Sequence, residues 1–341
     1  MKELKVVDAG SRDEWDGFIK SHPESNFLQS WDFYEFHIAR GKKVVRRLFF
    51  SGEEIVAAYA GVVETAKRGR YMAIAGGPIM DFKDSNVVKS VFCDIKEQGE
   101  STGCVFVRVR PQEELSEKSL ALMKEHGLKK APMYLSVEHA GILDLRKSEE
   151  EILAGASQGF RRKLRKAEKL DLEITAKASA SEIADFCRLE KLHAKRQQYV
   201  AFSEEFLTKQ FEAFSKNDEV LIYTARLGDE ILAMNFMIFY GAEASYHYGV
   251  SSELGTKYSA APLLHLRAME EARKRGCVRY NLWGIVGREE TSHRFYGVSE
   301  FKRSFGCEEL KYTPAHDLVL KPVAYLKNLT VEKVRKKIRH V

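Results

Sequence analysis

The fold is decided by residues 245–284, which begin with SYHYGVS (245–251) and end with CVRYNLWG (277–284). Aromatic residues alternate in the first segment and apolar residues cluster in the second, and both patterns predict strands. Between them, apolar residues recur at helical spacing from Leu263 to Ala272, and Gly276 ends the helix that they predict. Strand, helix and strand in this order form the core of an α/β domain.

The first half of the chain repeats this order. Strands are predicted at 48–50 and 55–63 around Gly52, as they are at 220–225 and 231–239 around Gly228. A strand over 70–74, a helix over 86–101 and a strand over 104–109 complete the first copy. Equivalent landmarks are offset by about 175 residues, which is typical of a duplicated domain. A β-hairpin followed by strand, helix and strand is the core order of the GNAT acyltransferase fold. We therefore expect an α/β (α+β) chain with two tandem GNAT-like domains.

We expect residues 1–146 together with 318–341 to form the first domain, and residues 147–317 to form the second. The segment GILDL (141–145) is interpreted as the last strand of the first copy. The tail ends in a basic helix over 331–339, which we expect to pack back on the first domain.

The composition is that of a soluble globular protein, with 341 residues, 44% hydrophobic residues and 30% charged residues. No apolar run approaches the roughly 20 residues that a membrane span needs. The five cysteines and ten histidines show no metal-ligand spacing. Cys93, Cys104 and Cys277 lie in apolar segments, which predicts buried thiols in a reducing cytosol. We expect a cytoplasmic protein without a metal or another cofactor.

Residues 160–169, FRRKLRKAEK, predict a strongly basic helix. Its cations can simply form a solvated face, with Leu164 and Ala167 packed inward. They would equally suit the phosphate backbone of an RNA. Both interpretations stay open for the cations of this helix, which are Arg161, Arg162, Lys163, Arg165 and Lys166.

Two further segments hold candidate site residues. HAKRQQY (193–199) ends an apolar-periodic helix, and its Arg196 is either a surface charge or a bidentate clamp for a diphosphate. YGVSEFKRSFG (296–306) is interpreted as a loop that places Lys302 beside Phe301 and other aromatic residues. A partly desolvated lysine there can stabilise an oxyanion, although an exposed lysine beside a hydrophobic cluster is as common. Tyr248, near a strand end, is either a substrate contact or a half-buried strand tyrosine.

Several segments together resemble one known family. They are NFLQSW (26–31), GPIMD (77–81), RRKLRKA (161–167), YGVS (248–251), YNLWGI (280–285) and the segment 296–306. In this order they are similar to the FemABX aminoacyltransferases, which build peptidoglycan cross-bridges from aminoacyl-tRNA on two GNAT-like domains. The long helical hairpin of some members is missing, so the chain resembles a compact member.

The resemblance implies an acyl-transfer role for Lys302 with Phe301, and a place for Tyr248 in the reaction cleft. The basic helix over 160–169 would bind tRNA. The resemblance implies a precursor-phosphate position for Arg196, and the other expected substrate-binding residues are Tyr199, His37, Trp31, Tyr246 and Asn281. The chain departs from the family at four places, which are His37 for a lysine, Gly76 for an arginine, Asn281 for an aspartate and Arg110-Pro111 where an acidic residue is common.

The resemblance implies an enzyme that transfers an amino acid from aminoacyl-tRNA to the stem-peptide amine of a UDP-linked or lipid-linked muropeptide. We expect a monomer without stable DNA binding and allow for peripheral contact with a membrane. Two alternatives stay open: a GNAT-type N-acyltransferase that uses acyl-CoA or another thioester on a small amine or polysaccharide, and a non-enzymatic RNA- or wall-binding protein. Residues 252–260 count against CoA, because their lone Gly255 stands where GNAT enzymes hold the pyrophosphate with a glycine-rich loop.

Overall fold

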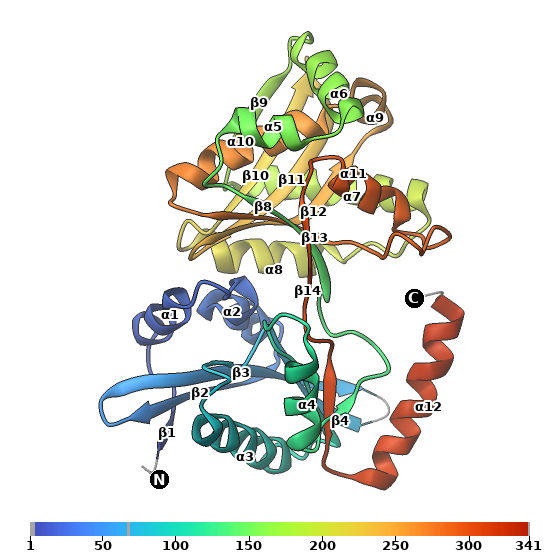
Figure 1. Ribbon diagram of the computed structural model, residues 1–341. Coiled ribbons are helices and arrows are strands. Elements are labelled where there is room, and N and C mark those ends of the chain that lie inside the picture. The colour runs from blue at the N-terminus through green and yellow to red at the C-terminus, as the bar shows by residue number, and fades with distance from the viewer. Residues whose placement is uncertain (1–3, 67–68, 340–341) are drawn as a thin grey trace. The chain divides into compact units, whose positions relative to one another are not determined.

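The computed structural model of the protein describes residues 4–66 and 69–339, with side chains as far as Glu332. The chain forms two compact units, Met1–His139 with Leu310–Val341 and Ala140–Glu309 (Figure 1). These boundaries fall earlier in the chain than the expected ones at 146 and 317. No helix in the described part is long and apolar enough to cross a membrane. The cysteines are all free thiols, and Cys93 is exposed although its apolar neighbours predicted burial.

The first unit is built on a mixed sheet with the strand order β1-β2-β3-β4-β6-β15-β7, and β5 pairs with β3. Its strands are β1 (Lys5–Asp8), β2 (Lys43–Ser51), β3 (Glu54–Ala66), β4 (Gly69–Ala75), β5 (Ile79–Met80), β6 (Phe106–Arg110), β7 (Lys129–Lys130) and β15 (His316–Val319). Its helices are α1 (Arg12–Ser21), the 3₁₀ turn η1 (Phe27–Gln29), α2 (Trp31–Ala39), α3 (Ser85–Ser101), α4 (Glu117–Glu125) and α12 (Pro322–Arg339).

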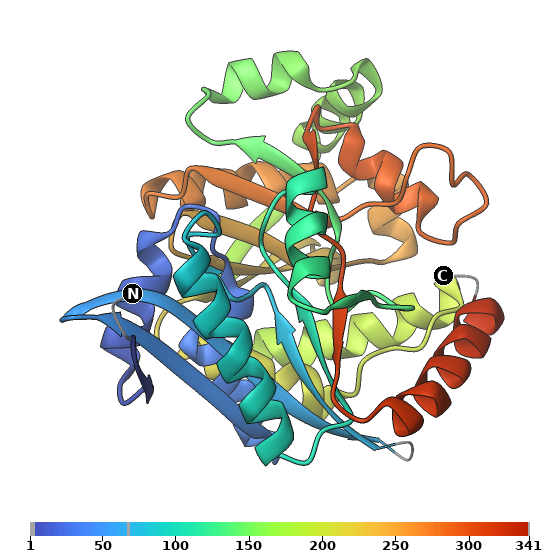
Figure 2. The same ribbon diagram turned by 60° about the horizontal axis from the view of Figure 1, so that its bottom comes forward.

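The predicted hairpin, strand, helix and strand of the first copy are β2-β3, β4, α3 and β6. Helix α3 begins at the N-cap Asp84, packs its apolar face on the core and lies across the sheet (Figure 2). β4 and β6 pair in parallel at five positions, from Tyr71–Phe106 to Ala75–Arg110. All five residues of β6 are therefore paired with β4.

Two segments that carry the family resemblance interlock in the first unit. Gln29 donates a hydrogen bond to the Ala75 carbonyl (2.8 Å) and accepts one from the Ala60 amide (2.9 Å). A Cβ at Gly77 would lie 2.7 Å from the Gln29 side chain, so the close approach requires glycine. NFLQSW and the glycines before Pro78 therefore serve as scaffold.

The second unit is built on a sheet with the order β14-β8-β13-β12-β11-β10-β9. Its strands are β8 (His139–Asp144), β9 (Glu173–Lys177), β10 (Val220–Leu227), β11 (Glu230–Tyr240), β12 (Glu243–Ser251), β13 (Arg279–Gly284) and β14 (Glu308–Lys311). Its helices are α5 (Glu149–Gly155), α6 (Gln158–Glu168), α7 (Ala180–Gln197), α8 (Glu204–Ser215), α9 (Glu253–Tyr258), α10 (Ala261–Lys274) and α11 (Tyr296–Arg303). Helices α10 and α8 lie on opposite sides of this sheet (Figure 1).

Two predictions about the second unit are wrong. The strand over 141–145 is β8, which pairs antiparallel with β13 in the second sheet and does not close the first copy. An apolar strand beside a domain boundary has no local signal for the sheet that it joins. The segment 296–306, which we expected to be a loop, contains helix α11.

The parallel strands β12 and β13 separate partway along their length. In the described part of the chain they pair at three positions, the last of which is Ser245–Asn281. β12 continues to Ser251 and β13 to Gly284 beyond that point. Backbone groups beyond the separation need partners other than the neighbouring strand, which sets the second unit apart from the first.

A β-bulge in β12 changes which face its aromatic residues occupy. Tyr248 lies opposite Phe236 and Tyr246 opposite Met237, so His247 is the extra residue of the bulge. Because Phe236 and Met237 are neighbours on β11, they point to opposite faces of the sheet. Tyr246 therefore lies on the α10 face, and Tyr248 lies on the face covered by α7 and α8.

Candidate active site

Helix α11 holds the chain segment that follows β13. Its residues Ser299, Lys302 and Arg303 have the spacing i, i+3 and i+4, so they share one helix face. Ser299 Oγ accepts a hydrogen bond from the Val286 amide (3.0 Å), and Arg303 donates to the Val286 carbonyl. Lys302 Nζ donates to the Gly284 carbonyl (2.8 Å). Helix α11 thus places Lys302 beside the end of β13, beyond the separation from β12.

The Lys302 side chain is a buried amine without an acidic partner among the described residues. It is 7% exposed, and its Nζ lies 5.7 Å from the centre of the Tyr246 ring. Burial lowers the pKa of Lys302 from 10.5 to about 7, because the charged form loses its hydration. Both protonation states are therefore populated near neutral pH, and such perturbed groups are typical of functional sites.

A histidine that the sequence analysis did not single out lies in the same cluster. The ring of His265 is 4.4 Å from that of Tyr246, 5.8 Å from that of Phe301 and 4.9 Å from that of Phe305. Burial, with the Lys302 charge as a second cause, lowers the pKa of His265 to about 3. His265 is therefore neutral at physiological pH. Its only sequence signal is a polar residue within the apolar stretch 262–266 of α10.

The structure brings Tyr246 rather than Tyr248 to Lys302. The Tyr248 ring lies 5.2 Å from Phe202 and 5.7 Å from Phe236, on the other face of the sheet. Phe301 packs with the cluster around His265.

Gly249 makes room for the Tyr246 hydroxyl, because a Cβ at Gly249 would lie 1.6 Å from Tyr246 Oη. We expect Gly249→Ala to displace the Tyr246 ring from Lys302 and to lower kcat/KM for acyl transfer by roughly tenfold or more. Tyr246→Phe keeps the ring and should lose less activity. Thermal unfolding of both variants separates this effect from misfolding. Wild-type activity in Gly249→Ala would show that the position of Tyr246 is unimportant.

Arg196 and Tyr199 lie at the end of α7. Arg196 donates a hydrogen bond to the Ser251 carbonyl at the end of β12, and Tyr199 Oη donates to Glu190 (2.8 Å). Burial raises the pKa of Glu190. The other N–H groups of Arg196 have no partner among the described residues except His193 Nδ1, at 3.0 Å. The guanidinium is therefore held in place with donors to spare for an anion.

Three other predicted residues make structural contacts. Asn281 is buried, donates to Glu243 (3.1 Å) and accepts from the Trp283 amide (2.8 Å). In the first unit, burial and nearby cations lower the pKa of His37 to about 3, so His37 does not supply the positive charge of a lysine. The Trp31 ring lies 3.9 Å from the Arg46 guanidinium.

The basic helix α6 divides its cations between structure and solvent. Arg161 donates to the carbonyls of residues 153, 154 and 156 and so satisfies the end of α5. Lys166 donates to the Lys257 carbonyl (2.9 Å), and Arg165 to the Arg161 carbonyl (3.3 Å). Arg162 and Lys163 are exposed. Phe160, Leu164 and Ala167 are buried, as the pattern predicted for the last two.

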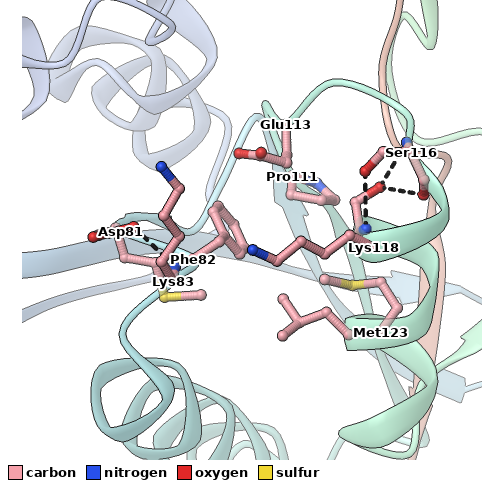
Figure 3. Close-up of a pocket in the computed structure, with 11 residues that line it drawn as sticks. Asp81, Phe82, Lys83, Pro111, Glu113, Ser116, Lys118 and Met123 are labelled. Atoms are coloured by element: carbon pink, nitrogen blue, oxygen red, sulfur yellow. Dashed lines mark hydrogen bonds between the residues drawn. The ribbon is translucent and has the colours of Figure 1, made fainter.

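A cavity of about 310 Å³ lies within the first unit, between the end of β5, the segment after β6 and the first turn of α4 (Figure 3). Lys118 extends across it toward Phe82 (Figure 3). Burial and neighbouring carboxylates raise the pKa of Glu113. The lining of the cavity combines apolar side chains, among them Met80, Phe82 and Met123, with the charged side chains Asp81, Lys83, Glu113 and Lys118. No cluster of His, Cys, Asp and Glu side chains in the described residues would hold a metal ion.

The fold and the matching families define the chain as an acyltransferase with two GNAT-like units. Residues 155–303 match the acetyltransferase (GNAT) domain, and residues 11–126 match the FemAB family. The FemAB match over residues 11–126 supports the resemblance to the FemABX family seen in the sequence.

Solved structures have the same fold. The crystal structure of FemX has a TM-score of 0.85 and 16% identity, over 95% of this chain and 99% of that chain. A tandem GNAT protein from the clavulanic acid biosynthesis pathway has a TM-score of 0.59 and 11% identity, over 93% and 98%. L-PGS from Bacillus licheniformis has a TM-score of 0.52 and 14% identity, over 84% and 89%. No curated protein matches the sequence.

Proposed function

We propose that the chain transfers an amino acid from aminoacyl-tRNA to the stem-peptide amine of a peptidoglycan precursor in the cytoplasm. The amine nitrogen attacks the ester carbonyl carbon, a C–N bond forms and the C–O bond to the ribose breaks. The ribose oxygen leaves as a hydroxyl with the proton that the amine loses. The reaction needs no protein nucleophile, metal or cofactor.

The observation that carries this proposal is the burial of the Lys302 amine at the end of β13. Aminolysis of an ester passes through a tetrahedral oxyanion, which a cation in a site of low dielectric stabilises strongly. Lys302 is buried, is held by α11 and is poised near neutrality. Its protonated form would stabilise the oxyanion, while a neutral amine positioned by the precursor site attacks.

Two features favour tRNA over CoA as the donor. The segment where a GNAT enzyme has its phosphate loop is helix α9, which Ser252 caps through the Gly255 amide (3.0 Å). A Cβ at Gly255 would lie 1.8 Å from the Leu232 carbonyl oxygen, so this glycine serves the packing of α9 on β11. The exposed cations of α6 favour a polyanionic donor.

The double substitution Arg162→Ala with Lys163→Ala is expected to weaken aminoacyl-tRNA binding and to reduce the salt dependence of log Kd by about 1.4–1.8, the value for two lost phosphate contacts. Both residues are exposed, so thermal unfolding should stay near that of the wild type. Arg161→Ala is the contrasting variant, because it removes hydrogen bonds from the end of α5 and should lower stability. An unchanged salt dependence in the double variant would place the tRNA elsewhere.

The acceptor side of the proposal rests on two separate places. The cavity of the first unit offers Lys83 and Lys118 beside apolar walls, which suits an anionic group attached to a larger precursor. In the second unit, Arg196 offers guanidinium donors that suit a diphosphate.

An acyl-CoA donor is the alternative, and one observation favours it. Helix α10 begins at Ala261, its N-cap residue Ala260 makes no side-chain hydrogen bond, and Pro262 lies in its first turn. Uncapped first-turn amides can bind a pyrophosphate. Calorimetric titration with CoA decides between the two donors. Saturable binding of CoA would support an acyl-CoA donor, and the absence of binding heat would support aminoacyl-tRNA.

The direct test is to incubate the protein with charged total tRNA and UDP-linked muropeptide and to measure the product by mass spectrometry. A parallel reaction contains acetyl-CoA in place of the tRNA. Addition of one amino-acid residue mass only in the tRNA reaction is expected. An acetyl mass only in the CoA reaction would overturn the proposal.

A further inference from the structure

Helix α12 is fixed to the first sheet by one of its faces. β15, which precedes it, pairs with β6, and Arg108 on β6 binds both oxygens of Asp317 (2.7 and 2.8 Å). The same guanidinium donates to Glu332 on α12 (2.8 Å), and Tyr325 Oη donates to Asp317 (2.8 Å). These side chains are buried, so the inner face of α12 is anchored by an ion-pair network.

The opposite face of α12 carries exposed aliphatic side chains. Val323 is 77% exposed, Leu326 61% and Val331 38%. Lys327 and Thr330 are exposed as well. The exposed positions 323, 326–327 and 330–331 are three to four residues apart, so they form one continuous stripe along the helix. Aliphatic residues gathered in this way on the outside of an anchored helix indicate a binding surface.

The charge of this part of the chain is strongly positive. Residues 321–339 contain one acid, Glu332, whose carboxylate binds Arg108. They contain seven cations, which are Lys321, Lys327, Lys333, Arg335, Lys336, Lys337 and Arg339. The side chains of the last five lie outside the described residues, and the sequence alone supplies their charge.

We propose that the outer face of α12, together with the cations that follow it in the sequence, binds the surface of membranes that contain anionic phospholipid. Aliphatic side chains enter the boundary between headgroups and acyl chains, and cations bind the headgroups. An RNA would account for the cations, but it would leave Val323 and Leu326 without a role. The surface lies in the first unit and stands independently of the acyl donor.

Sedimentation of the full-length protein with vesicles tests this inference. Vesicles of phosphatidylcholine with phosphatidylglycerol should bind the protein, and vesicles of phosphatidylcholine alone should bind at least about tenfold less. Raising the salt concentration should weaken the binding. Equal binding to both vesicles, or no binding to the anionic ones at low salt, would overturn the proposal.

Matched variants separate the two parts of the surface. Val323→Ser with Leu326→Ser keeps every charge and should lower the partition coefficient about tenfold or more. Leu192→Ser on α7 removes an equally exposed leucine, at 62%, and should change nothing. Replacing Lys327, Lys333 and Lys336 by glutamine leaves four of the seven cations and should weaken the preference for anionic lipid.

Two results would contradict the assignment of this face to lipid. One is wild-type vesicle binding by the double serine variant. The other is an absence of vesicle binding together with RNA binding that the glutamine variant loses, which would make the surface an RNA site. Circular dichroism and thermal unfolding of each variant confirm that the comparison is made between folded proteins.

Discussion

Replacing Lys302 by methionine is expected to lower kcat/KM for aminoacyl transfer by about a hundredfold or more, with the fold retained. Methionine has nearly the same length and fills the same apolar space, so packing against Tyr246 is kept. What is lost is the charge beside the separation of β12 and β13 that would stabilise the oxyanion. The assay follows the transfer of a labelled amino acid from tRNA to the muropeptide.

A matched control is Lys274→Met, which removes an exposed lysine at the end of α10 and should keep wild-type activity. The pH dependence adds a second criterion. If protonated Lys302 is the active form, the wild-type kcat/KM should fall as the pH rises through about 7. The Lys302→Met variant should not show this fall. A variant that turns over as fast as the wild type would remove Lys302 from the mechanism.

The same substitution is expected to raise the free energy of unfolding at pH 7 by roughly 1–3 kcal/mol. A pKa of about 7 in the folded protein, against 10.5 for a free lysine, corresponds to roughly 4 kcal/mol of destabilisation at pH 7. Methionine removes this cost. The Gly284 carbonyl loses its donor, however, and a buried group without a partner costs about 1–3 kcal/mol.

The gain should depend on pH in a defined direction. Between pH 7 and 10.5 the unfolded lysine keeps its proton while folded Lys302 has lost it, so the unfolded state binds more protons. Wild-type stability therefore rises with pH across this window. The advantage of Lys302→Met should be largest below the window, shrink within it and reverse above it. Urea unfolding at pH values below, within and above the window measures the difference.

The sign of this effect separates two roles for Lys302. A lysine that only holds the Gly284 carbonyl would make the variant less stable at every pH. Ser299→Ala is the control, because it breaks a hydrogen bond to the same segment without removing an ionisable group. It should lower stability by about 1 kcal/mol, with no dependence on pH in this range. If Lys302→Met is less stable than the wild type at pH 7, burial of the Lys302 charge does not lower the stability of the folded protein. That result would contradict a trade of stability for function at this position.

Local patterns were enough to predict the repeated order of elements. Turn glycines at 52 and 228 mark the two hairpins, and apolar periodicity marks α3 and α10. Ser30 caps α2 by accepting a hydrogen bond from the Phe33 amide, because a serine before a helix can satisfy a free first-turn amide. The assignment of β8 to the first copy failed, because strand pairing depends on residues far away in the sequence.

The sequence by itself determined the two GNAT-like copies and the resemblance to the FemABX family and singled out Lys302 as a candidate, because periodicity and short motifs are local properties. Tertiary structure alone decided which tyrosine accompanies that lysine. Alternation in SYHYGVS predicts Tyr246 and Tyr248 on one face, and the bulge at His247 puts them on opposite faces. The pKa of Lys302 was likewise not readable from its neighbours in sequence. It follows from burial among side chains of α10, α11 and β12, and desolvation depends on everything that packs around a charge.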